Sequence, residues 1–186
     1  MVEITKKYKI GTRRFGLVNW YGTWTLYVKE VLRFLNVWAQ TLFSPLISSL
    51  LFLLVLSLAI GTERGEVLGV SFITFLAPGL IAMQIIQQAF SHSSSSLMIK
   101  KIDGTIVDLL FAPLSASEAT IAISLAAVTR SVLLAIISII TFTIIIDIQI
   151  QNYLTLISFT FLSSFILGNI GIIAGLWAEK FDNMAT

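Results

Sequence analysis

The stretch from Ile99 to Glu118, IKKIDGTIVDLLFAPLSASE, is the longest break with polar residues between two very apolar segments. Thr105 and Asp108 have the spacing of a capping box, which predicts that a short helix begins near Thr105. Pro113 disfavours helical geometry at the residue before it, so this helix should end near Ala112. The stretch therefore predicts a short, capped helix between two long apolar segments.

This short helix would carry an apolar surface beside the ends of both neighbouring segments. Its apolar residues are Ile106, Val107, Leu109, Leu110 and Phe111. Ser115 and Glu118 form a second capping box, which predicts the start of the next long helix. A chain that only reverses direction needs just a few polar residues. Two interpretations stay open: the stretch is a packed connector, or it is a docking element for a soluble partner.

The composition indicates a membrane protein. Of 186 residues, 56% are hydrophobic and 12% are charged, and the mean hydropathy is +0.92. Soluble domains carry about 25% charged residues, so this chain would expose large apolar patches in water. It contains no cysteine, which excludes disulfides, thiolate metal sites and cysteine nucleophiles. The fold class predicted is an all-α, polytopic transmembrane helical bundle.

Four stretches are apolar and long enough to cross a bilayer, at about residues 39–60, 68–90, 119–146 and 153–177. Pro45 falls within the first turns of the first span, where a missing N–H is least costly. The fourth span has small residues at a spacing that permits close helix packing. They are Gly168, Gly171 and Gly175.

The second and third spans contain residues that are unusual in hydrocarbon. They are Pro78, Gly79, Gln84, Gln87, Gln88 and Arg130. The Pro-Gly pair should kink or loosen the second span, and the three amides need partners from other helices or a water path. Arg130 should lie one or two turns inside the cytoplasmic face, where it either reaches the headgroups or points at a protein partner. These six residues are candidates for a translocation path or for helix packing.

The stretch Asn19–Trp38 has aromatic and apolar residues at helical spacing on one side and Lys29, Arg33 and Asn36 on the other. This pattern is typical of an amphipathic helix that lies in the membrane interface. The alternative is a helix packed on a protein core. The basic segment Met1–Gly16 before it should be a solvated tail near anionic headgroups.

The basic residues predict the orientation. Most of the twelve Lys and Arg residues precede Trp38, and Lys100 and Lys101 follow the second span. The two polar turns on the opposite side, 61–66 and 147–152, together contain one basic residue, Arg64. By the positive-inside rule, both ends of the chain and the stretch Ile99–Glu118 are cytoplasmic.

Motifs of catalytic sites are absent from the sequence. There is no phosphate-binding loop, HExxH or GxSxG motif, and Asp103 and Asp108 are too few carboxylates for a membrane transferase. His92 has no second His or nearby carboxylate in the sequence, so we expect it at the membrane interface and not on a metal. The spans hold one charge, Arg130, whereas proton-driven carriers usually need an intramembrane Asp, Glu or His. We therefore expect no catalytic, metal or cofactor site, and uphill transport would take its energy from another chain.

The order of elements resembles the permease subunit of type 2 ABC exporters, the ABC-2 family. The residues that carry the resemblance are Phe75–Leu80 in the second span, the serine cluster Ser91–Ser96, Gly104–Leu110 with Ala112–Ser115, and Gly175–Ala178 with Phe181-Asp182. The GTI-x-DLL and PLS pieces within Gly104–Ser115 are the most specific, and the resemblance covers essentially the whole chain.

The resemblance implies a transporter subunit without its own catalytic site, in a bacterial inner membrane. Two permease chains would pair, two separate ATPase subunits holding ATP and Mg would dock below them, and alternating access would export a drug, glycolipid or polysaccharide. No nucleic acid partner is implied. A cytoplasmic coupling helix would fit a groove on the ATPase. The residues matching it are Gly104, Thr105, Ile106, Asp108, Leu109, Leu110 and Pro113.

One departure from the family concerns length. Family permeases normally have six spans, whereas this chain supports four and ends at Thr186, where the loop before a fifth span would lie. We therefore expect a single, incomplete ABC-2 transmembrane domain over residues 1–186. The alternative function is a small membrane scaffold or sensor that binds a cytoplasmic partner without transport.

Overall fold

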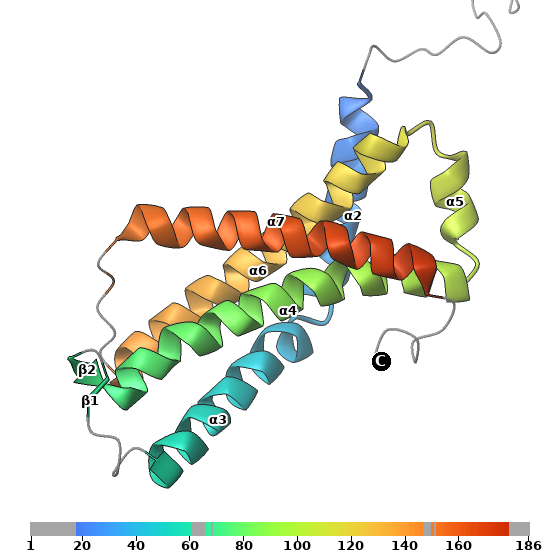
Figure 1. The fold of residues 1–186 in the computed structure, drawn as a ribbon. Coiled ribbons are helices and arrows are strands. Elements are labelled where there is room, and N and C mark those ends of the chain that lie inside the picture. The colour runs from blue at the N-terminus through green and yellow to red at the C-terminus, as the bar shows by residue number, and fades with distance from the viewer. Residues whose placement is uncertain (1–17, 61–65, 68, 147–149, 151, 179–186) are drawn as a thin grey trace, which may run out of the picture.

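The computed structural model describes residues 18–60, 66, 67, 69–146, 150 and 152–178. The elements in order are α2 (Trp20–Leu35), the π-helical turn η1 (Ala39–Phe43), α3 (Ser44–Ile60), β1 (Glu66–Val67), β2 (Val70–Ser71), α4 (Phe72–Ile102), α5 (Ile106–Phe111), α6 (Ala116–Ile146) and α7 (Tyr153–Trp177). Figure 1 shows that α4, α6 and α7 form a bundle, with α3 at its edge and α5 beyond the end of α4. The basic tail and most of both polar turns lie outside the described residues.

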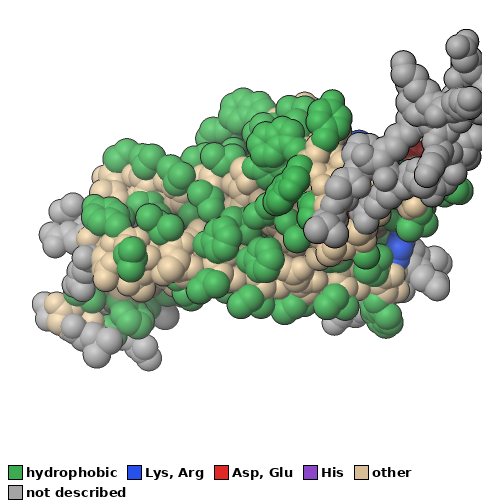
Figure 2. Space-filling view, turned by 90° about the horizontal axis from the view of Figure 1, so that it is seen from above, with side chains coloured by type: hydrophobic (Ala, Val, Ile, Leu, Met, Phe, Trp, Pro, Cys, Tyr) green, Lys and Arg blue, Asp and Glu red, His purple; other side chains and the backbone are tan. Residues whose placement is uncertain are grey.

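Four helical stretches are long and apolar enough to cross a membrane. They are Ala39–Ala59, Phe72–Ile102, Ala116–Ile146 and Tyr153–Trp177. On the face in Figure 2, charged side chains are visible only toward the end that carries α2 and α5, and the rest is hydrophobic or uncharged. These observations confirm the predicted all-α polytopic bundle. The one departure in the described part is a two-residue antiparallel hairpin, which pairs Val67 with Val70.

The second helix differs most from its predicted bounds. Ser71 caps its start by accepting a hydrogen bond from the backbone N–H of Thr74 at 3.3 Å, so α4 begins after the hairpin. The helix then continues past the predicted end at Phe90, through the serine run. Ser94 and Ser95 donate their hydroxyl protons to backbone carbonyls one turn earlier, at 2.9 and 3.1 Å. Because these hydroxyls are satisfied by the helix itself, the serines do not end it.

The glycines of α7 pack closely against the backbone of α4. A Cβ at Gly171 would lie 2.5 Å from the carbonyl oxygen of Phe90, and a Cβ at Gly175 would lie 2.8 Å from that of Ser94. Only glycine permits this separation, so the predicted small-residue packing is confirmed. The contact fixes α7 beside the half of α4 that leads to α5.

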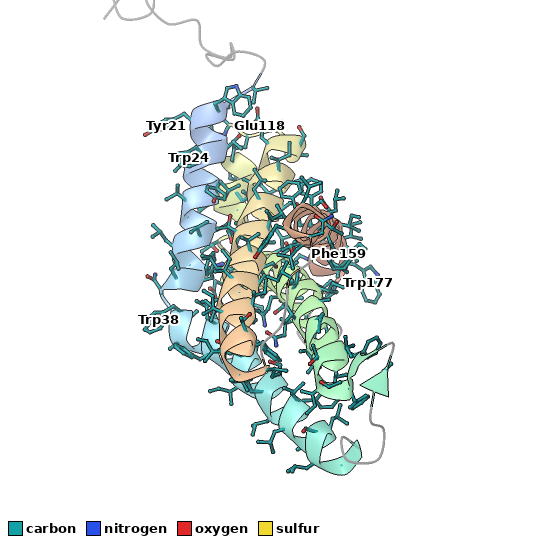
Figure 3. The ribbon with its side chains drawn as sticks, turned by 90° about the vertical axis from the view of Figure 1, so that its left-hand side faces the viewer. Tyr21, Trp24, Trp38, Glu118, Phe159 and Trp177 are labelled. Carbon is teal, nitrogen blue, oxygen red and sulfur yellow. The ribbon has the colours of Figure 1, made fainter. Side chains whose placement is uncertain are left out.

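The helix α2 packs along the first half of α6 (Figure 3). Trp24 and Trp38 point away from the bundle and are 63% and 54% exposed, as an interfacial helix requires. A different stripe, Leu26, Glu30 and Phe34, is buried. The two interpretations of this helix therefore both describe part of it: one face is packed on protein, and the aromatic face is free for lipid.

Candidate functional site

The short helix α5 is positioned by a tight turn after α4. Gly104 has φ +73°, a left-handed conformation that L side chains rarely adopt, and its N–H donates to the carbonyl of Lys101 at 3.3 Å. The helix ends at Phe111 because Ala112, the residue before Pro113, is extended (ψ 144°). The predicted limits of the helix are thus confirmed.

The predicted capping box at the start of α5 is not formed. Thr105 is the residue before the helix, but its side chain makes no capping hydrogen bond. Its backbone is already helical (φ −74°, ψ 0°), whereas a capping residue normally takes the extended region to turn its hydroxyl toward the helix. The carboxylate of Asp108 still lies in the first turn, where it stabilises the positive end of the helix dipole.

The apolar residues of α5 divide into two sets. Ile106 and Leu109 pack against a buried cluster from α4, α6 and α7, formed by Leu97, Ile123 and Ile172. Leu110 and Phe111, in contrast, are 76% and 85% exposed. The helix is therefore attached to the bundle by one side and presents a leucine and a phenylalanine on the other.

The capping box at the start of α6 is formed and also holds α2. The backbone N–H of Glu118 donates to Ser115 Oγ at 3.3 Å, and the backbone N–H of Ser115 donates to Glu118 Oε2 at 2.7 Å. The other carboxylate oxygen accepts the backbone N–H of Asn19 at 2.7 Å, and Asn19 Nδ2 donates to the carbonyl of Pro113 at 3.1 Å. Glu118 therefore lies where α2 begins (Figure 3) and joins α2 to the loop between α5 and α6.

A buried charge network, formed by Glu30, Arg33, Ser96 and Lys100, joins α2 to α4. The carboxylate of Glu30, 1% exposed, accepts hydrogen bonds from Lys100 Nζ, from Arg33 Nε at 3.0 Å and from Ser96 Oγ at 2.8 Å. Burial alone would raise the pKa of Glu30, but the charges of Lys100 and Arg33 and the two hydrogen bonds from α4 outweigh it and hold this pKa below the ordinary value. The carboxylate is thus ionised at neutral pH and fixes the two helices together.

His92, which we expected at the membrane interface, has a side chain enclosed by the protein. Its side chain is fully buried, edge-on to the ring of Phe34, with 5.7 Å between the ring centroids. Its Nε2 lies 3.9 Å from Glu30 Oε2, and its carbonyl accepts a hydrogen bond from Arg33 at 3.1 Å. The sequence showed no carboxylate near His92 because Glu30 comes from another helix.

The network could have been noticed in the sequence. Glu30 lies one turn from both Leu26 and Phe34, and an acidic residue in an apolar stripe indicates a buried ion pair. The partner of Glu30 is Lys100, which the sequence predicted only to lie on the cytoplasmic side. Lys101 has a separate role, because its Nζ donates to the carbonyl of Ala178 at 3.0 Å, at the carboxyl end of α7.

The polar residues predicted inside the spans come together only in part. Arg130 donates from its guanidinium to Gln88 Oε1, and Ser138 Oγ donates to Gln84 Oε1 at 3.2 Å, so these residues join α4 to α6. Gln87 is exposed one turn from Gln84. Pro78 and Gly79 lie earlier in α4 and outside these contacts, within a helix that continues through both residues. The residues predicted for a coupling helix lie apart from these, beyond the other end of α4.

A groove of about 390 Å³, lined by both polar and apolar side chains, runs between α3 and α4. Its lining is Ser44, Pro45, Ser48, Ser49, Phe52, Leu80, Met83, Gln84, Gln87 and Gln88. Hydroxyl and amide groups are expensive to leave against hydrocarbon, so a groove of this composition needs a polar occupant, water or protein to cover it.

Comparisons with known proteins agree with this architecture. The ABC-2 type transporter family pattern matches residues 21–186. The inner membrane transport permease YadH of Escherichia coli K12 is 26% identical over 166 residues, and the match covers 89% of this chain and 65% of YadH. The YadH proteins of Escherichia coli O157:H7 and Shigella flexneri match to the same extent. This chain thus spans less than two thirds of the length of these curated relatives, and no solved structure matches it. Since the family pattern covers everything from α2 onward, the chain belongs to the ABC-2 type transporter family.

Proposed function

We propose that this chain is the transmembrane permease subunit of an ATP-driven ABC exporter in a bacterial inner membrane. Its family membership supports the transporter assignment, and its similarity to YadH, an inner membrane transport permease, supports the location. In this proposal separate ATPase subunits bind and hydrolyse ATP, and the cargo leaves the cytoplasm by alternating access. Drugs, glycolipids and polysaccharides are the substrate classes to test.

One observation carries the proposal: α5 ends in Leu110 and Phe111, which are 76% and 85% exposed. A helix that lies beyond the apolar spans and is packed on its other side has no need of exposed residues of this size for its own folding. Such residues suit the groove of a soluble partner, because large apolar anchors dominate binding energies. We assign this partner as the ATPase, and α5 as the coupling helix.

Motion of α5 would reach the spans through three attachments. Gly104 joins α5 directly to α4, the Ser115–Glu118 capping box joins the following loop to α6, and Asn19 joins that loop to α2. The buried pair of Glu30 and Lys100 then ties α2 back to α4. Because these attachments surround α5, a partner that pushes on the helix would move α2, α4 and α6 together. The proposed transporter would contain two copies of the permease.

The test compares two aspartate variants. Leu110→Asp removes an exposed anchor, so we expect ATPase co-purification and permease-stimulated ATP hydrolysis to fall at least tenfold while the folded yield stays unchanged. Leu109→Asp would bury a carboxylate beside Leu97 and is the folding control, since it should lower the yield itself. The partner to use in this test would be an ATPase encoded beside the permease gene.

Two outcomes decide the assignment. Full ATPase binding by well-folded Leu110→Asp and Phe111→Asp variants would refute α5 as the docking helix. A chain that binds no ATPase, but retains another cytoplasmic protein through these two residues, would favour the scaffold or sensor function instead.

A further inference from the structure

Arg130 is a charge without an acidic partner in the described part of the chain. Its guanidinium donates to Gln88 Oε1, and its Nε is buried and makes no hydrogen bond. The four candidate spans contain one acidic residue, Glu118, which lies in the first turn of α6, about three helical turns before Arg130. A guanidinium inside a span is expensive unless a counter-charge or water is near it. Arg130 thus has no counter-charge among the described residues.

The nearby charges add to this excess. Arg33 and Lys100 are both basic, and Glu30 is the acidic residue that they share. The group formed by Glu30, Arg33, Lys100 and Arg130 has three positive charges and one negative charge, so its net charge is +2. Around Arg130, which contacts the middle of α4 through Gln88, the protein would attract an anion.

The groove between α3 and α4 brings hydrogen-bond donors to the same place. Gln88 lines this groove and accepts from Arg130, so the guanidinium lies one hydrogen bond away from it. Gln84 also lines it, and its Nε2 is buried without a partner. Ser44 and Ser48 are exposed in the groove, and neither side chain makes a hydrogen bond in the described structure. Unsatisfied donors beside an uncompensated cation form the pattern of an anion site.

The apolar side of the groove indicates an amphiphile. Phe52, Leu80 and Met83 line it, and Phe52 and Met83 are 52% and 56% exposed. The outward face of α3 continues this surface with Ile47 and Leu51. A ligand with acyl chains would cover these residues while its headgroup reached the polar end. A second copy of this chain would not supply the counter-charge for Arg130, because its described spans contain no acidic residue except Glu118.

We propose that the groove between α3 and α4 binds the phosphate headgroup of an anionic amphiphile, with Arg130 as the counter-charge. Gln84, Gln88 and the two exposed serines donate hydrogen bonds to the phosphate, and the acyl chains lie along α3. The identification of this ligand as cargo rests on the proposed export function, whereas the binding itself does not.

The experiment measures binding to the full 186-residue chain in nanodiscs of neutral phosphatidylcholine. The probe is a fluorescent short-chain phosphatidic acid. Diacylglycerol with the same chains tests the need for phosphate, and inorganic phosphate tests the need for chains. Arg130→Gln should raise the Kd for phosphatidic acid at least tenfold, whereas Lys29→Gln, which removes an exposed charge outside the groove, should change it less than twofold.

A second variant protects the test from misfolding. Ser48→Leu fills the exposed rim of the groove without disturbing a hydrogen bond, so it should also weaken binding while the thermal stability stays the same. Equal affinity of wild type and Arg130→Gln for phosphatidic acid would overturn the proposal. So would equal binding of diacylglycerol, or displacement of the probe by inorganic phosphate at equal concentration. None of these readouts needs the ATPase, so loss of docking by Leu110→Asp is a separate result.

Discussion

Replacing Glu30 by glutamine should loosen α2 from the bundle. Glutamine has the same size and can still accept from Ser96, but it leaves Lys100 without a counter-charge, and that side chain is only 10% exposed. Removing one partner of a buried ion pair costs about 3–5 kcal/mol. Arg33 is 29% exposed and can turn toward solvent, so we expect the lower end, about 3 kcal/mol. This corresponds to roughly 150-fold in the equilibrium between docked and undocked α2.

The assay is hydrogen exchange of the backbone amides in nanodiscs, followed by mass spectrometry. Peptides from α2 should exchange roughly 100-fold faster in Glu30→Gln than in wild type, and peptides from α7 are the internal reference because they do not contact Glu30. Lys100→Met should have a similar effect, since it leaves the buried carboxylate with the half-buried Arg33 as its one counter-charge in the described structure. The double variant should recover most of the loss, because a neutral pair of similar size needs no counter-charge.

The pH dependence gives an independent check. Because the pKa of Glu30 is depressed in the folded protein, its contribution to stability is fully present above the ordinary value of 4.5 and is lost as the pH falls through the depressed value. After correction for intrinsic rates, α2 of the wild type should exchange faster below about pH 4.5, and α2 of the double variant should not. If the effects of Glu30→Gln and Lys100→Met on the exchange of α2 were strictly additive, and if pH had no effect on the wild type, the buried ion pair would be refuted.

Two further variants test the packing around the site. Gly171→Ala places a methyl group 2.5 Å from the carbonyl of Phe90 and should lower the free energy of unfolding by about 1–3 kcal/mol in thermal melts, whereas Gly79→Ala, with nothing within 4 Å, should not destabilise the protein. An equal effect of both would contradict the close contact of α4 and α7. Glu118→Ala removes the acceptor for Asn19 and half of the capping box, so exchange should rise by about one order of magnitude in the first turns of both α2 and α6. A rise in exchange confined to α6 would show that the start of α2 is not held by the hydrogen bond between Asn19 and Glu118.

Local chemistry made α5 and the helix that follows it predictable. Pro113 ends α5, Gly104 permits its entry turn, and Ser115 with Glu118 starts α6, and each of these effects acts within four residues of its cause. The packing of α7 was predictable for a similar reason, since three small residues on one face of a helix imply a close neighbour. What the sequence did not identify was that neighbour, which is α4.

The other features depend on residues that are distant in the chain. Glu30 and Lys100 are 70 positions apart, so neither shows in the sequence that it will be the partner of the other. The burial of His92 has the same origin, because it depends on where α2 lies. The sequence predicted a membrane span that ends near Phe90, whereas the helix α4 continues to Ile102. Its composition becomes polar after Phe90, but Ser94 and Ser95 donate to carbonyls of the helix itself and Ser96 donates to Glu30 of α2, so polarity did not mark the limit of the helix.

Glu30 of α2 and Arg130 of α6 both bond to side chains of α4, but their charges are balanced differently, so their roles differ. Glu30 accepts from three donors and is neutralised within the protein, so it has no capacity left for a ligand and serves to hold α2. Arg130 has one neutral partner, Gln88, and keeps a donor unused. A change at Glu30 should therefore alter how motion of α5 reaches the spans, and it should not weaken anion binding in the groove, because it removes a negative charge. A change at Arg130 should weaken the binding of phosphatidic acid without altering ATPase stimulation. The two quantities, measured together on both variants, should therefore respond independently.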